Sequence, residues 1–225
     1  MDNEIVVASQ YRGPPSSGNG GYVCGLLADT IGGVVTGILR APIPLDTPLR
    51  LTSEVQTARL TSADGNLIAE ARAGDASTLP TPPPPPAYDL AKSAGQRFVG
   101  LRRPFHPICF TCADGLAEGV GLRVFTGPVD GDLQDGVAGT WTPHAAFADR
   151  DGLARLEVIW AALDCPGSVA WLERGGQGGL LGTMTGEVLR RPPAGEPLPV
   201  IARLPWGADL PPSRLASGVC GLPEL

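Results

Sequence analysis

Two segments of this chain, one in each half, repeat the same order of residue types. Gly32 to Leu49 reads GGVVTGILRAPIPLDTPL, and Gly178 to Leu198 reads GGLLGTMTGEVLRRPPAGEPL. Each has a glycine pair, an apolar run, an arginine, a proline and a final Pro-Leu. A unit used twice in one modest chain predicts two similar α+β halves packed as a pseudo-dimer, because either half alone would leave a sheet face or edge uncovered. The alternative is that two strands punctuated by Gly and Pro resemble each other by composition alone.

Composition excludes several classes of function. The chain has 225 residues, of which 43% are hydrophobic, and a net charge of −6 with no block of five or more Lys and Arg, so nucleic acid is not an expected partner. No basic segment followed by an apolar run opens the chain, and no apolar run approaches the roughly 18 residues of a membrane span. Five cysteines, an odd number, favour reduced thiols over a secreted disulfide framework. We therefore expect a cytoplasmic protein without membrane contact.

One helix start is clear in the first half. Asn19, or a serine just before it, can cap the free amides of a helix, and the pair Gly32-Gly33 ends it. Gly21, Gly25 and Ala28 share one side of this helix at near-helical spacing. Small residues there predict that the helix lies very close to another backbone.

The rest of the first half, residues 1–80, reads as an antiparallel meander. Strands are expected at 34–39, 49–60 and 67–73, with a turn at Ala63-Asp64-Gly65-Asn66 between the last two. Residues 81–104 form a proline-rich connector, because the five prolines of 82–86 cannot join a strand ladder.

The second half, residues 105–225, is expected to repeat this plan incompletely. Strands are predicted at 121–125, 137–141, 155–162, 180–189 and 198–204, and a helix from Asp164-Cys165-Pro166 to the glycines at 175 and 176. No convincing strand follows Trp206, so the tail reads as irregular. The strand ending near Leu204 would then be an exposed edge, which predicts a homo-oligomer.

A glycine-rich capped helix laid into an antiparallel sheet, present twice, resembles the hotdog fold, and specifically the double hotdog of acyl-CoA thioesterases. The resemblance covers about residues 11 to 204. It is carried by Gly13-Pro14-Pro15, Asn19-Gly20-Gly21-Tyr22 and Trp160-Ala161-Ala162-Leu163-Asp164. The segment His106-Pro107-Ile108-Cys109-Phe110-Thr111-Cys112 also looks like a poorly characterised bacterial group of hotdog proteins.

The resemblance implies a thioester hydrolase that acts without a Ser-His-Asp triad and without a cofactor. It implies that Asp164 is the base that positions water, assisted by Asn19, and that Thr185 orients the water. The amides near Gly20 and Gly21, or near Cys165, would hold the developing oxyanion. The implied ligand is an acyl-CoA between the halves, in contact with Gly20, Gly21, Tyr22, Trp160 and Cys165.

Plainer interpretations of the same residues remain open. Asn19 can serve only as a helix cap, and Asp164 can cap the first turn of its own helix. Tyr22 and Trp160 suit a core as well as a binding site. No late strand offers the Gln or Asn that completes the water site in some relatives. The alternative function is therefore a non-catalytic hotdog protein that binds acyl-thioesters or other apolar ligands, or a structural subunit.

The sequence also contains one C-x-x-C pair, Cys109 and Cys112, three residues after His106. These are three potential zinc ligands, but a tetrahedral structural site needs a fourth, and His144 and Cys165 lie far along the chain. We therefore predict no metal site and interpret the two cysteines as small buried residues, with a zinc site or a redox pair as alternatives.

Overall fold

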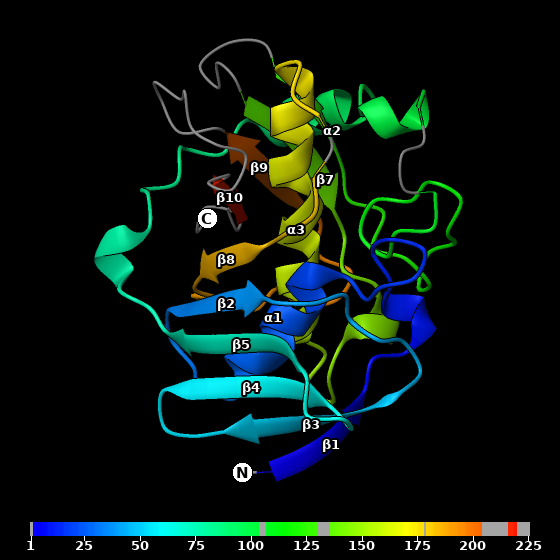
Figure 1. Ribbon diagram of the computed structural model, residues 1–225. Helices are drawn as coiled ribbons and strands as arrows, with labels where there is room; N and C mark the ends of the chain where they lie inside the picture. Colours follow the sequence, from blue (N-terminus) through cyan, green and yellow to red (C-terminus); the bar gives the residue numbers. More distant parts are fainter. Residues whose placement is uncertain (1, 104–106, 130–135, 178, 204–215, 220–225) are drawn as a thin grey trace.

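The computed structural model describes residues 2–103, 107–129, 136–177, 179–203 and 216–219, which form two antiparallel sheets and three α-helices (Figure 1). The strands are β1 (Asp2–Val6), β2 (Val35–Leu39), β3 (Pro48–Ser53), β4 (Thr57–Ser62), β5 (Leu67–Ala73), β6 (Phe125–Pro128), β7 (Gly136–Trp141), β8 (Thr183–Gly186), β9 (Leu198–Arg203) and β10 (Ala216–Val219). The helices are α1 (Gly20–Asp29), α2 (Tyr88–Gly95) and α3 (Leu156–Glu173). The mixed α+β class with antiparallel sheets agrees with the sequence analysis.

The first sheet has the order β1-β3-β4-β5-β2-β8, and α1 packs on one of its faces. The turn at residues 63–66 lies between β4 and β5 as predicted, with Gly65 at a φ of +80°. The single strand expected at 49–60 is wrong, because Glu54 N donates to Thr57 O (2.8 Å) and folds the segment into the β3–β4 hairpin. β1 was not expected from the sequence, and it pairs with β3.

The second sheet, of order β10-β9-β7-β6, lies between two helices. Ala138 of β7 and Ile201 of β9 pack with the alanines of α2. Their neighbours Val137 and Ala202 pack in a cluster with Val169 of α3. Successive side chains of a strand point to opposite faces, so α2 and α3 cover opposite faces of this sheet. The segment 81–104 is therefore more than a connector, since it supplies α2.

The helix α3 corrects the prediction for residues 155–173. Leu156 to Glu173 is one helix of 18 residues, so the strand expected at 155–162 is wrong, and Pro166 lies inside the helix instead of at its start. Residues 158–162 are all buried, because α3 has α1 on one side and the second sheet on the other. A helix buried on several sides has no polar face, and its apolar run then reads like a buried strand.

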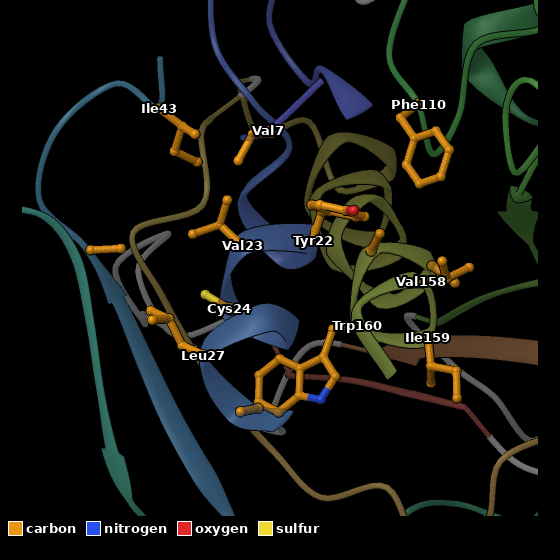
Figure 2. Packing of buried hydrophobic residues seen from close by; sticks show 14 of the residues in the cluster. Val7, Tyr22, Val23, Cys24, Leu27, Ile43, Phe110, Val158, Ile159 and Trp160 are labelled. Carbon is orange, nitrogen blue, oxygen red and sulfur yellow. The ribbon is translucent and has the colours of Figure 1, made fainter. Parts of the chain in front are cut away.

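The two long helices touch at their backbones. A Cβ on Gly25 would lie 2.4 Å from Glu157 Cα, and a Cβ on Gly21 would lie 2.5 Å from the Trp160 carbonyl oxygen. This confirms the prediction that the glycines of α1 permit a very close approach. In Figure 2, α1 lies between the first sheet and α3, with Leu27 and Trp160 filling the space around it.

The repeated segments supply two neighbouring strands. β2 comes from the first copy and β8 from the second, and they pair antiparallel with Thr36 opposite Thr185. Each threonine is followed by glycine, Gly37 or Gly186, so a local two-fold axis through the threonine pair relates the two copies. Gly178, where the second copy begins, lies outside the described residues. The sheet thus joins the two halves of the chain at the repeat.

The tail contains a strand that the sequence did not indicate. β10 pairs with β9 from Ala216↔Arg203 to Val219↔Val200. β9 is therefore an interior strand between β10 and β7, and the expectation that it forms an exposed edge is wrong. Residues 204–215 and 220–225 of the tail lie outside the described residues, and homo-oligomerisation stays a prediction. None of the described helices combines the length and apolarity needed to cross a bilayer.

The contact between α1 and α3 predicts a large cost for one added methyl group. Gly25→Ala should lower the free energy of unfolding by about 2 kcal/mol, because overpacking against backbone outweighs the helix propensity gained. Chemical denaturation measures the change. Gly115→Ala is the control, since a Cβ at Gly115 meets no atom within 4 Å. Equal stability of Gly25→Ala and the parent protein would contradict the close packing.

Candidate functional site

Asn19 caps α1 as the sequence predicted. Its backbone is extended (φ −68°, ψ 130°), and its side-chain Oδ1 accepts a hydrogen bond from Tyr22 N at 2.8 Å. Only 1% of the residue is exposed. A buried cap of this kind satisfies one of the amides that the first turn of a helix leaves without a partner.

The side-chain nitrogen of Asn19 links α1 to α3 through a threonine. Asn19 Nδ2 donates to Thr111 Oγ1 (3.3 Å), and Thr111 Oγ1 donates to the Ala161 carbonyl (2.8 Å). Thr111 is fully buried. The sequence analysis did not single out Thr111, because a lone threonine inside the C-x-x-C segment gives no signal of its partners 50 and 92 residues away.

Asp164 binds the first turn of α1, not that of its own helix. It is the ninth residue of α3, so the interpretation of Asp164 as the cap of its own helix is wrong. Its Oδ2 accepts a hydrogen bond from Gly21 N at 3.0 Å. The close approach at Gly21 places the carboxylate there, since a Cβ on Gly21 would lie 3.0 Å from Asp164 Cβ.

The surroundings of Asp164 shift its acidity. The pKa of Asp164 is raised to about 6, and burial is the largest cause. The hydrogen bond from Gly21 N lowers this pKa, and the nearby Cys109 raises it. Hydrogen bonds from the Asn19 side chain and the Gly20 amide lower it further. The residue as a whole is half-buried, and its carboxylate group lies deep.

The helix amides expected to hold an oxyanion are already engaged. Gly21 N donates to Asp164, Tyr22 N donates to the Asn19 side chain, and Val23 N donates to the Asn19 carbonyl at 3.2 Å. The second suggested location, near Cys165, is wrong, because Cys165 lies in the middle of α3 and its amide is not at a helix start. What α1 offers at this point is the positive end of its dipole, with Asp164 bound to it.

Thr185 lies away from this group. Its Oγ1 is 2.9 Å from Thr36 Oγ1, its partner across the β2–β8 pair. The neighbouring Gly37 faces α1, where a Cβ would lie 2.7 Å from Cys24 Sγ. Adjacent residues of a strand face opposite sides, so Thr36 and Thr185 are on the face of the sheet opposite to α1. The structure therefore does not bring Thr185 to Asp164 and Asn19.

The aromatic residues proposed as substrate contacts fill the core. Tyr22 stacks on Tyr11 with ring centroids 4.2 Å apart, and Phe110 packs edge-on against both rings. Trp160 is 2% exposed and lies between Gly25 of α1 and Gly186 of β8. Figure 2 shows Tyr22 and Trp160 among the apolar side chains around α1. Both follow the core interpretation of the sequence analysis.

The side chain of Cys165 lies next to the C-x-x-C pair in the folded chain. The Sγ atoms of Cys109, Cys112 and Cys165 all lie within 4.8 Å of one another. The interpretation of Cys165 as too distant to join the pair is therefore wrong, since α3 brings it there across 56 residues. His106, the other residue of the motif, lies outside the described residues.

A separate cleft of about 770 Å³ opens beside α2 and β7. Its walls carry three aromatic side chains, Phe125, Trp141 and Phe147, the cations Lys92 and Arg123, and the acidic Glu118. No described residue accepts a hydrogen bond from the buried Trp141 Nε1. Such a lining suits an apolar ligand with a polar group. This cleft was not predicted from the sequence, because its residues come from distant segments.

The buried threonines offer a matched test of the Asn19 network. Thr111→Val should lower the free energy of unfolding by about 1–3 kcal/mol, because Asn19 Nδ2 and the Ala161 carbonyl both lose a buried partner. Thr126→Val is the control: Thr126 is equally buried, but its Oγ1 has no hydrogen-bond partner among the described residues, so the change should be neutral or stabilising. Equal losses in the two variants, measured by chemical denaturation, would contradict the role given to Thr111.

Comparison with known proteins supports the fold. No family profile and no curated protein matches the sequence. Among solved structures, the chain is similar to a protein provisionally described as a thioesterase from Novosphingobium aromaticivorans, at 15% identity and a TM-score of 0.54, over 92% of this chain and 84% of that one. It is also similar to the tesB protein of Mycobacterium avium subsp. paratuberculosis, at 14% identity and a TM-score of 0.51, over 92% and 81% of the two chains. This chain therefore shares its fold with these two proteins, the first of which is provisionally described as a thioesterase.

Proposed function

We propose that this protein is a double-hotdog thioester hydrolase that acts on acyl-CoA or a related thioester, with Asp164 as its general base. The observation that carries the proposal is the deep carboxylate of Asp164, which accepts a hydrogen bond from Gly21 N at the positive end of α1, beside the buried amide of Asn19. The fold shared with thioesterase-named proteins supports the same reaction class. Action in the cytoplasm belongs to the proposal and rests on the sequence.

We infer that a water molecule occupies the acceptor position of Asp164 that the protein donors leave. A carboxylate has about four acceptor positions, and the amides of Gly20 and Gly21 and the Asn19 side chain supply three donors. A water bound at the remaining position would be aligned by a group able to take its proton. Asn19, held in turn by Thr111, keeps the carboxylate in place.

The proposed reaction uses these groups in two steps. Asp164 takes a proton from the water as the water oxygen bonds to the thioester carbonyl carbon, and the dipole of α1 favours the negative charge that develops. The carbon–sulfur bond then breaks, and the proton on Asp164 passes to the departing thiolate. The products are a carboxylic acid and a free thiol, and the carboxylate of Asp164 is regenerated.

The second candidate is a protein that binds acyl-thioesters or other apolar ligands without turnover. It is favoured by the engagement of the α1 amides, which leaves no free pair of donors for an oxyanion at Gly21 and Tyr22. The aromatic cleft beside α2, with Lys92 and Arg123 at its wall, is the place where such a ligand would bind.

A hydrolysis assay with short, medium, long and aromatic acyl-CoAs distinguishes the two proposed functions. Asp164→Asn should lower kcat/KM at least about a hundredfold, the scale of a lost general base, while its amide oxygen can still accept from Gly21 N. Asp75→Asn is the matched control, because Asp75 also accepts a backbone hydrogen bond, from Ser77 N, but lies on an exposed turn. Circular dichroism confirms that both variants fold.

Two results would contradict the proposed hydrolase function. One is wild-type protein that is folded and hydrolyses none of the acyl-CoAs, in which case stabilisation against heat by the same compounds would support the binding protein. The other is Asp164→Asn with wild-type activity, which would remove Asp164 from the reaction.

A further inference from the structure

Three of the cysteines form a cluster that the proposed hydrolase reaction does not use. Cys109 and Cys112 lie on the loop that precedes β6, and Cys165 lies on α3. Their sulfur atoms are all within 4.8 Å of one another, and Cys109 Sγ and Cys165 Sγ are 3.7 Å apart. Four cysteines among the described residues are free thiols, and the fourth, Cys24, packs separately between α1 and β2.

We propose that Cys109, Cys112 and Cys165 bind a zinc ion through three thiolate sulfurs, with a fourth coordination position open to water or an external ligand. The test of this metal site does not depend on hydrolase activity.

The spacing of the sulfurs fits this metal. Zinc–sulfur bonds are about 2.3 Å long, so two sulfurs of a tetrahedral zinc site lie about 3.8 Å apart. The distance of 3.7 Å between Cys109 Sγ and Cys165 Sγ matches this sulfur–sulfur distance. A disulfide needs sulfurs about 2.05 Å apart, so the same pair would have to move by more than 1.5 Å to form one.

The chemistry of the three side chains suits zinc. Cysteine sulfur is a common zinc ligand, and it binds the metal as a thiolate. Zinc binding to three thiols therefore releases three protons to solvent.

The loop is held in place by bonds that need no metal. Phe110 N donates to the Arg12 carbonyl (2.8 Å), Leu122 N donates to the Phe110 carbonyl (2.7 Å), and the Thr111 hydroxyl donates to Ala161. These partners come from three different segments of the chain. The three sulfurs are therefore brought together by the fold, and the ion would enter a site that already exists.

The three cysteines differ little in exposure. Cys109 and Cys112 are buried, and Cys165 is half-buried as a whole residue. Zinc sites with only three protein ligands keep the fourth position for water or an external ligand.

The test is the metal content and the cobalt spectrum of the full chain. Protein purified under reducing conditions from zinc-supplemented cells should contain about one zinc per chain by mass spectrometry. After removal of the zinc with a chelator, added Co²⁺ should give sulfur-to-cobalt charge-transfer absorption and the visible bands of a tetrahedral ion. Each of Cys109→Ser, Cys112→Ser and Cys165→Ser should weaken zinc binding more than tenfold, since loss of a ligand exceeds the cost of losing an outer partner.

Each control variant also loses one cysteine, but it keeps the three cysteines of the site. Cys24→Ser removes a buried thiol outside the cluster, and Cys220→Ser removes the fifth cysteine, which lies outside the described residues; both should keep the zinc and the cobalt spectrum. Folded, reduced wild-type protein that gives no thiolate-cobalt absorption would overturn the proposal without any variant. So would equal zinc affinity in wild type and Cys165→Ser, or a mass two hydrogens lower under non-reducing conditions, which would indicate a disulfide.

Discussion

The backbone contact between α1 and α3 is the constraint on which the rest of this structure depends. It exists because Gly21 and Gly25 have no side chain where α3 passes. Only at this separation can Asp164, in the middle of α3, reach the free amide of Gly21. The same contact joins the helix that packs on the first sheet to the helix that packs on the second. The halves are thus connected at the helices as well as at the β2–β8 strand pair.

The loop containing residues 107–113 completes the region that this contact creates. Thr111 lies between Asn19 of α1 and Ala161 of α3, so it links both helices by hydrogen bonds. Successive residues of a helix diverge by about 100°, which explains how Asp164 and Cys165 serve different neighbours. Asp164 faces the first turn of α1, and Cys165 faces the cysteines of the loop. The candidate base and the thiol cluster therefore lie side by side without sharing a role.

Much of the local structure was predictable because it depends on local signals. Asn19 was identified as a cap, the glycines after α1 as its end, and the turn at Gly65 as the connection between β4 and β5. α3 was mistaken in part for a strand, since its apolar residues are covered on several sides and show no amphipathic period. Its misplaced start also led to the interpretation of Asp164 as a cap of its own helix.

The apolar composition, the strand patterns and the spacing of small residues on α1 already indicated a mixed α+β fold with a closely packed helix, because each is a property of neighbouring residues and their period. Which residues meet was decided by the tertiary structure. Thr111 and Ala161 are 50 residues apart, and Cys109 and Cys165 are 56 apart. Thr185, although it follows α3 in the chain, points away from Asp164 because of its register in the sheet. Contacts across such separations depend on helix crossing and strand register, and no local pattern of residues encodes either.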